Sequence, residues 1–235
     1  MNQTTQLSEL LTYLASNQDE AEDSGRVPAL DRLSLELGVS ISKLREQLEV
    51  ARGLGFVDVR PRTGIRRLPY SFTPAVRQSL LYGIAIEPEL FDAYSDLRNQ
   101  VETVYWYQAV ECLQIEDHEA LRKLVAQAWE YLRGYPVRIP QLEHRQLHLL
   151  IYRRLDNPFV TGILEAFWDA YEAVGLNLYT DFSYLEQVWQ YHERMVDAIC
   201  RGDFGAGYQA LIEHKTMLQN RPSPKSRKWI ANAFE

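Results

Sequence analysis

The sequence has 235 residues, 46% of them hydrophobic, so it is long enough to bury a core and to form one large domain or two smaller ones. It contains no run of about eighteen apolar residues that would span a membrane, and its polar start lacks the basic and apolar regions of a signal peptide. The only cysteines, Cys112 and Cys200, form neither a disulfide framework nor a CxxC metal motif. We therefore expect a cytoplasmic globular protein with two core thiols.

Two short helices are predicted near the start of the chain. The first carries four leucines on one helical stripe, Leu7, Leu10, Leu11 and Leu14. It ends at the acidic segment NQDEAEDSG, which has no apolar residue larger than alanine. The second helix has Pro28 in its first turn and Gly38 at its end. Its predicted inward residues are Leu30, Leu33 and Leu37.

A third helix, ISKLREQLEVARG, follows directly. Ser40 is the expected N-cap of this helix, and Gly53 ends it. Its predicted inward residues, at positions i, i+4 and i+7, are Leu44, Leu48 and Ala51. Its predicted outward residues are Ser42, Lys43, Arg45 and Gln47. The third helix therefore presents a polar and basic face to its surroundings.

A β-hairpin is predicted after the third helix. Strand candidates at residues 56–60 and 65–69 flank the turn PRTG, whose proline and glycine favour a tight reversal. The segment RPRTGIRR contains four arginines and no acidic residue. The formal net charge of the chain is −7, but residues 41–67 carry +4, which leaves −11 for the rest. This asymmetry predicts a basic N-terminal module attached to an acidic body.

From residue 73 onward the sequence predicts helices alone. Long amphipathic segments are separated by short breaks such as GYPVRIP and DNP. They predict helices near residues 75–83, 88–113, 117–133, 138–155, 157–178, 181–201 and 203–219. The tail RPSPKSRKWIANAFE has two prolines and a basic cluster and is expected to form an extended arm.

The N-terminal module has the features of a DNA-binding unit. Two short helices joined by a tight turn, the second with polar and basic side chains outward, fit the major groove of DNA. The hairpin arginines could neutralise phosphates, or enter the minor groove beside the backbone at Gly64. The alternative is that these arginines form a solvated surface, because basic hairpins are common.

Residues 27–67 resemble the winged-helix domain of the GntR family of bacterial transcription regulators. The shared features are the proline of the second helix, the LGVS turn, an arginine–glutamate pair, the GLGFV segment and the glycine at the wing tip. The resemblance implies binding to double-stranded DNA by a two-fold homodimer on a palindromic operator. The family's DNA contacts carry over at Arg45, Arg62 and Gly64 only. Ser42 and Lys43, on the outer face of the third helix, complete the expected DNA-binding residues.

Two positions depart from the family pattern. Asp31 stands where the family usually has an arginine in the second helix, and Ile41 stands where it usually has one after the turn serine. Two phosphate or base contacts are therefore missing, and an altered operator or weaker binding is expected.

The HxxxH pattern in QLEHRQLHLL raises the question of a metal site. His144 and His148 share one face of a predicted helix, close enough to bind one divalent ion, although this spacing alone more often marks two ordinary histidines. His192 and His214 each lie in the middle of an apolar-periodic helix. Neutral imidazoles on inward faces of neighbouring helices could converge on a metal. His118, at a predicted helix start, is expected in solvent.

Residues 85–220 resemble the FCD ligand-binding domain, the all-helical partner of the winged helix in the FadR subfamily of GntR regulators. The resemblance rests on DLRNQVE, HRQLHLLIYRRLDNPFV, YHERMVDAICRGD and GYQALIEHKTML. Many such domains bind a divalent metal through an aspartate four residues before a histidine and two further histidines on the last two helices. His148, His192 and His214 match the three histidines, and His144 stands at the aspartate position.

The replacement of that aspartate decides which metal is expected. Four imidazoles without a hard anionic ligand favour zinc, nickel or copper over manganese or magnesium. Zinc is the first choice because it is available and indifferent to geometry, and nickel is the alternative. Two other interpretations stay open: His144 points away and leaves three ligands, or the site is vestigial.

The resemblance also implies an effector. A small organic acid would place its carboxylate at the metal, and an arginine in the first long helix would take its second oxygen. Arg98 stands at that arginine position. The other interpretation of Arg98 is an ordinary surface pair with Glu102 at i,i+4.

A metal held by histidines also describes a hydrolase. Hydrolysis needs a general base near an open coordination position. Glu102 and Glu143 are conceivable bases, but neither lies in a recognised hydrolase motif. We therefore expect a regulator and no enzyme. The alternative is a metal-dependent sensor or metallohydrolase-like protein whose DNA binding is weakened or lost.

These features give the predicted organisation, whose fold class is mainly α. A winged helix-turn-helix with a small hairpin occupies residues 1–70, and a linker with a short helix occupies residues 71–87. An antiparallel bundle of six or seven helices, resembling the FCD domain, occupies residues 88–220, and residues 221–235 form the tail.

Overall fold

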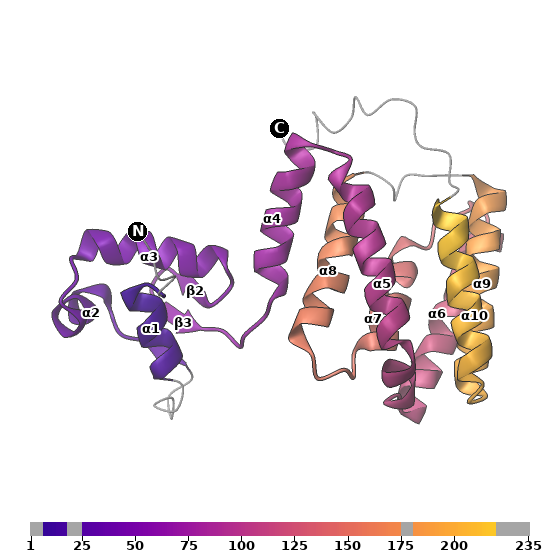
Figure 1. The fold of residues 1–235 in the computed structure, drawn as a ribbon, viewed down its shortest axis with the longest axis horizontal. Coiled ribbons are helices and arrows are strands. Elements are labelled where there is room, and N and C mark those ends of the chain that lie inside the picture. Colours follow the sequence, from indigo (N-terminus) through magenta and orange to yellow (C-terminus); the bar gives the residue numbers. More distant parts are fainter. Residues whose placement is uncertain (1–6, 18–24, 175–180, 220–235) are drawn as a thin grey trace. The chain divides into compact units, whose positions relative to one another are not determined.

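The chain folds into two compact units, residues 1–78 and residues 79–235. The computed structural model describes residues 7–17, 25–174 and 181–219; the predicted tail and most of the acidic segment after the first helix lie outside these ranges. Helices dominate both units, and a small antiparallel sheet lies in the first (Figure 1). The predicted mainly α fold class is confirmed.

The first unit contains three helices and three short strands in its described part. The helices are Glu9–Ser16 (α1), Leu30–Leu37 (α2) and Ile41–Gly53 (α3), and the strands are Arg26–Val27 (β1), Val57–Arg60 (β2) and Gly64–Arg67 (β3). The sheet is antiparallel, in the order β1-β3-β2. Sequence periodicity could not reveal β1, because two residues are too few to show alternation.

The turn between α2 and α3 follows from its local sequence. Gly38 adopts φ 65° and ψ 27°, the left-handed conformation that ends many helices. Two residues later the Ser40 hydroxyl accepts a hydrogen bond from the backbone N–H of Lys43 and caps α3. The inward positions of α3 are confirmed, since Leu44, Leu48 and Ala51 are all buried. This turn fixes the direction in which α3 leaves α2.

Two side chains of the first unit differ from the sequence expectation. Gln47 was expected on the outer face of α3 but is only 9% exposed. Its Oε1 accepts a hydrogen bond from the backbone N–H of Leu10 at 2.9 Å, because the start of α1 covers this part of α3. Leu7, expected on the inward stripe of the first helix, precedes α1 and is 61% exposed.

The second unit is helical throughout its described part. Its helices are Thr73–Ile86 (α4), which begins in the first unit, Leu90–Glu111 (α5), Ile115–Arg133 (α6), Gln141–Tyr152 (α7), Pro158–Ala173 (α8), Phe182–Cys200 (α9) and Phe204–Gln219 (α10). The α4 helix extends beyond the predicted linker helix at residues 75–83. It does so because Ile84, in its second half, joins a buried cluster with Phe91 of α5 and Phe167 of α8. Within the described ranges, no helix is long and apolar enough to cross a membrane.

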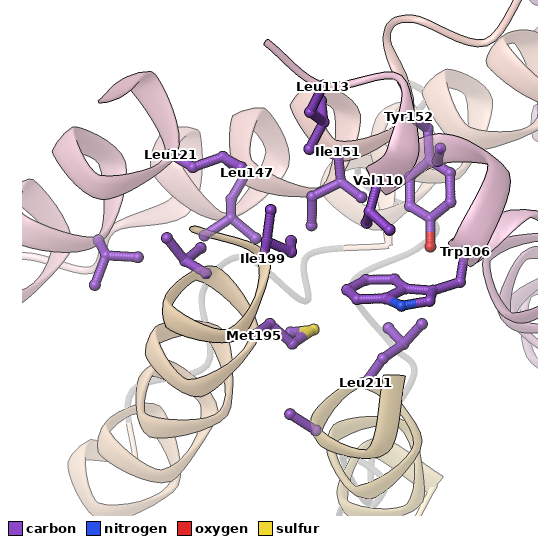
Figure 2. Packing of buried hydrophobic residues seen from close by; sticks show 14 of the residues in the cluster. Trp106, Val110, Leu113, Leu121, Leu147, Ile151, Tyr152, Met195, Ile199 and Leu211 are labelled. Atoms are coloured by element: carbon purple, nitrogen blue, oxygen red, sulfur yellow. The ribbon is translucent and has the colours of Figure 1, made fainter. Parts of the chain in front are cut away.

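The main core of the second unit lies among α5, α6, α7, α9 and α10. Figure 2 shows side chains from these helices directed toward one another: Trp106, Val110, Leu113, Leu121, Leu147, Ile151, Tyr152, Met195, Ile199 and Leu211. The expectation of two core thiols is wrong for Cys112, which is exposed because it follows the last turn of α5. Cys200 is only partly buried, at the margin of the core.

One glycine determines how closely α10 approaches α5. A Cβ atom at Gly207 would lie 2.7 Å from Cζ2 of Trp106, a separation that real Cβ atoms do not show. The indole Nε1–H of Trp106 donates a hydrogen bond to the carbonyl oxygen of Phe204 at 2.9 Å. The absent side chain at residue 207 therefore lets the buried indole of Trp106 lie against the start of α10.

Replacement of Gly207 by alanine should destabilise the second unit. Overpacking of a close-packed interior costs about 1–3 kcal/mol, and the indole of Trp106 is buried and has little room to move. All five tryptophans of the sequence lie beyond residue 105. Tryptophan fluorescence during urea unfolding therefore measures the free energy of unfolding of this unit.

Gly205→Ala is the matched control on the same helix. Its Cβ would meet only Oδ1 of Asp203, at an ordinary 3.8 Å, and alanine favours the helix over glycine by up to about 1 kcal/mol. This variant should be as stable as the wild type or more stable. Equal stabilities for Gly205→Ala and Gly207→Ala would contradict the close approach of α10 to Trp106.

Candidate metal centre

Four of the five histidines come together inside the second unit. His144 and His148 lie on α7, His192 on α9 and His214 on α10. One ring nitrogen from each lies within 4.8 Å of the corresponding nitrogens of the other three. The spacing of four residues along α7 places two imidazoles on one helix face, and the neighbouring helices supply the others. The structure thus brings the whole predicted ligand set together.

The imidazoles of this cluster are removed from water. His148, His192 and His214 are buried, and His144 is half-buried. Nε2 of His148 lies 3.0 Å from Nε2 of His192. Two nitrogens bound to one tetrahedral zinc ion at the usual bond length lie about 3.3 Å apart. The two Nε2 atoms are therefore already close to the separation that a shared ion requires.

His144 faces the other histidines. Its ring centroid lies 4.7 Å from that of His192 and 5.2 Å from that of His148. The ring centroid of Trp168, on α8, lies 4.7 Å from that of His144, and the two rings meet edge-on. The interpretation in which His144 points away is not supported by this geometry.

Burial keeps these imidazoles neutral. It lowers the pKa of His148, His192 and His214 well below the ordinary value of 6.5, and the nearby Arg98 guanidinium lowers each pKa further. A neutral imidazole offers a lone pair to a metal, whereas an imidazolium does not. These three imidazoles therefore have the protonation state of metal ligands.

The hydrogen bonding of the cluster tests whether a metal fits. Both ring nitrogens of His214 and Nδ1 of His192 are buried and have no hydrogen-bond partner within the described part of the chain. A buried polar atom left unsatisfied costs about 1–3 kcal/mol. A divalent ion would satisfy the one lone pair that each neutral imidazole offers, and nitrogen donors suit zinc and nickel. The four histidines therefore fit a divalent zinc or nickel ion.

An ion pair lies beside the cluster on α5. Nη2 of Arg98 lies 2.7 Å from Oε1 of Glu102, and the two residues are 1% and 0% exposed. The i,i+4 pair therefore exists, but it is buried, so the alternative interpretation of Arg98 as part of an ordinary surface pair is wrong. The Arg98 guanidinium also lies over the ring of Phe167, 4.6 Å from its centroid.

Glu102 also contacts the cluster directly. Its Oε1 lies 3.0 Å from Nδ1 of His148. Burial raises the pKa of Glu102, while the charge of Arg98 opposes that rise. The sequence could show that Glu102 shares a helix face with Arg98, but not that His148, 46 residues away, would meet it. Glu102, considered above as a general base, thus lies in contact with a predicted metal ligand.

The predicted DNA-binding residues lie on the surface of the first unit. Ser42, Lys43 and Arg45 are exposed on α3, and Arg62 and Gly64 are exposed at the hairpin between β2 and β3. Arg62 and Gly64 have φ angles of 70° and 82°. Arg62 thus occupies a conformation that is uncommon for a residue with a side chain, and it projects from the tip of a tight turn.

One of these residues is held by the protein itself. Nζ of Lys43 lies 2.5 Å from Oε1 of Glu9, at the start of α1. Hydrogen bonds from Lys43 and Gln47 lower the pKa of Glu9 to about 2. A phosphate that approaches Lys43 therefore competes with this carboxylate. Sequence periodicity gave no sign of this contact, because Glu9 and Lys43 are 34 residues apart.

Comparison with known proteins matches both units. The FCD domain family matches residues 92–216, which include Arg98 and the four histidines. The solved structure of a GntR protein from Streptococcus agalactiae has a TM-score of 0.63 and 18% identity, covering 89% of this chain and 95% of that chain. Escherichia coli McbR/YncC, also 18% identical, covers 97% of this chain and 98% of its own with a TM-score of 0.49. No curated protein matches the chain significantly.

Removal of the central histidines should abolish metal binding. Purified wild-type protein should contain about one zinc or nickel ion per chain by elemental analysis, whereas a His148→Ala, His192→Ala variant should contain almost none. His118→Ala is the control, because His118 lies outside the cluster. Equal metal content in the wild type and the double variant would refute the site.

The metal-free protein should lose stability as the pH falls below 6.5. The folded-state pKa values of His148, His192 and His214 are depressed, so below 6.5 the unfolded chain binds more protons than the folded one. Each histidine then removes up to about 1.4 kcal/mol per pH unit. Above pH 6.5 these histidines add no pH dependence to the free energy of unfolding.

Urea unfolding of the metal-free protein, followed by tryptophan fluorescence between about pH 7.5 and about pH 5.5, measures this loss. The raised pKa of Glu102 acts in the opposite direction, but one carboxyl can offset only one of three imidazoles. A free energy of unfolding that stays constant over this range would contradict burial of neutral histidines.

Proposed function

The chain belongs to the FCD-domain family and has the winged-helix fold of the FadR subfamily of GntR transcription regulators, and from this membership we propose that it binds operator DNA under the control of a small organic acid. The acid would bind at or near a divalent metal in the helical unit. The observation that carries the proposal is the convergence of four imidazoles, three of them buried, beside a buried arginine. No catalytic activity is proposed.

The DNA-binding role belongs to the first unit. The proposed contacts come from the exposed residues of α3 and from the hairpin tip, Ser42, Lys43, Arg45, Arg62 and Gly64. The +4 charge of residues 41–67, in a chain of net charge −7, supports a local interaction with phosphates. Two copies would bind a palindromic operator as a homodimer, in the cytoplasm where the DNA is.

The metal role belongs to His144, His148, His192 and His214. Four imidazole nitrogen donors support zinc as the first choice and nickel as the alternative. Such an ion supplies a Lewis-acidic centre that attracts a carboxylate. The histidines themselves hold three helices, α7, α9 and α10, in one arrangement around the site.

Arg98 is the proposed partner of the effector carboxylate. Its guanidinium is buried and pairs with Glu102, so an acid reaches it only if the side chains that cover it move. Side chains around Arg98 must therefore rearrange when the acid binds. The protein would then have two states, one with Arg98 open to the acid and one with Arg98 covered, and these states differ in their affinity for the acid. Acid binding changes the affinity for operator DNA if the DNA also binds one of the two states more tightly.

A mobility-shift assay with the protein's own upstream DNA tests the proposed function. The fragment should shift, and the shift should respond to a chelator and to one member of a panel of small organic acids. A melting-temperature screen of the same acids would identify the effector independently. Absence of any shift, combined with a chelator-sensitive hydrolytic activity, would favour the metallohydrolase alternative instead.

Arg45→Ala should weaken operator binding. If Arg45 contacts a guanine, its removal costs about 1–3 kcal/mol on the operator and less on unrelated DNA. If it contacts only phosphate, affinity falls evenly across sequences. Quantitative mobility shifts on operator and unrelated fragments distinguish these cases.

Arg52→Ala is the control on the same helix. Arg52 lies in the last turn of α3, and its guanidinium pairs with Glu49 at 2.5 Å. This variant should bind the operator almost as the wild type does. An Arg45→Ala protein with unchanged operator affinity would remove Arg45 from the interface.

A further inference from the structure

One carboxylate oxygen of Glu102 lies between Arg98, the proposed effector arginine, and His148, a proposed metal ligand. Oε1 of Glu102 is 2.7 Å from Nη2 of Arg98 and 3.0 Å from Nδ1 of His148. Arg98 and Glu102 are four residues apart on α5, so they share a helix face, and His148 approaches from α7. All three side chains are buried, so water does not compete for these contacts.

The stretch of α5 from Arg98 to Glu102 contacts three neighbouring helices. The Tyr152 hydroxyl, on α7, donates a hydrogen bond to the backbone carbonyl oxygen of Glu102 at 2.8 Å. Arg98 lies over Phe167 of α8, and Lys215 of α10 donates to the backbone carbonyl of Asn99 at 2.7 Å. These contacts involve the backbone and Arg98, whereas the Glu102 carboxylate itself contacts Arg98 and His148.

This placement has a consequence for the imidazole of His148. Oε1 of Glu102 forms an ion pair with the Arg98 guanidinium, and a carboxylate oxygen so paired can only accept hydrogen bonds. Nδ1 of His148 must then carry its proton toward the same oxygen, and Nε2 keeps its lone pair. That lone pair is directed at the cluster, where Nε2 of His192 lies 3.0 Å away.

We propose that Glu102 is a positioning residue of the metal centre, which holds His148 as the Nδ1-protonated tautomer with Nε2 directed at the ion. Arg98 supports this role through its ion pair with Glu102. A carboxylate that hydrogen-bonds a metal-bound histidine fixes its ring and raises its basicity. The inference rests on the proposed metal site and adds a residue that does not itself touch the metal.

The test uses the full-length protein and zinc alone. Competition with a chromophoric chelator measures zinc affinity, and ring-nitrogen chemical shifts of metal-free, ¹⁵N-histidine-labelled protein report the tautomer of His148. Because Glu102→Ala would leave the Arg98 charge buried and alone, the main variant is Arg98→Met with Glu102→Leu, which replaces both charges by apolar groups. Glu102→Gln is the conservative variant, since it keeps an acceptor for Nδ1.

The double variant should bind zinc about 10- to 100-fold more weakly, and its His148 should shift toward the Nε2-protonated tautomer. Glu102→Gln should lose less affinity and keep the wild-type tautomer. Tyr152→Phe is the matched control, because it removes an equally buried hydrogen bond to Glu102 without touching His148. It should resemble the wild type in both measurements.

Wild-type zinc affinity and an unchanged tautomer in the double variant would overturn the proposal. A weaker affinity without any change of tautomer would also overturn it, because structural damage alone produces that result. A wild-type protein that binds no zinc or nickel would refute the metal site itself, and this outcome is recognised before any variant is compared.

Discussion

Removing an imidazole, a guanidinium or a carboxylate from water costs free energy unless another partner replaces the lost hydration, and the interior of the second unit contains all three groups. The Arg98–Glu102 pair replaces part of that hydration internally, and Glu102 extends the compensation to His148. His214 and one nitrogen of His192 have no such compensation within the described residues. The helices around them must therefore be held by their apolar contacts. The large core around Trp106 supplies those contacts. The free energy gained by burying that core therefore offsets the cost of the unpaired histidine nitrogens.

Most of the fold could be predicted because its elements are long and strongly periodic. Helical spacing of leucines identified α3, and prolines, glycines and capping residues located most of the helix ends to within a few residues. The failures come from contacts between elements. Gln47 looked solvent-exposed from its own helix, but α1 covers it, and Cys112 looked buried although it follows the last turn of α5. Periodicity describes one element at a time and carries no information about which neighbour covers it.

In the candidate site, too, features of a single helix could be predicted and several contacts between helices could not. The sequence predicted which four histidines would meet, since two share a helix face and two lie at inward positions, and the FCD resemblance supplied the pattern. It did not predict that the Arg98–Glu102 pair would be buried, because the i,i+4 spacing of opposite charges occurs most often on surfaces. Nor could it predict that Glu9 would hold Lys43, since that contact joins the first helix to the third. In both cases a carboxylate pairs with a basic residue that is expected to bind an anion: Glu102 with Arg98, and Glu9 with Lys43.

The contact between Gly207 and Trp106 has a consequence for how this sequence can change over evolutionary time. A side chain at residue 207 and the indole at residue 106 would claim the same volume, so neither position can vary alone without a cost. Among related sequences a larger residue at one position should accompany a smaller residue at the other. The pair would then appear as correlated positions on two helices about a hundred residues apart, although neither residue belongs to the histidine cluster.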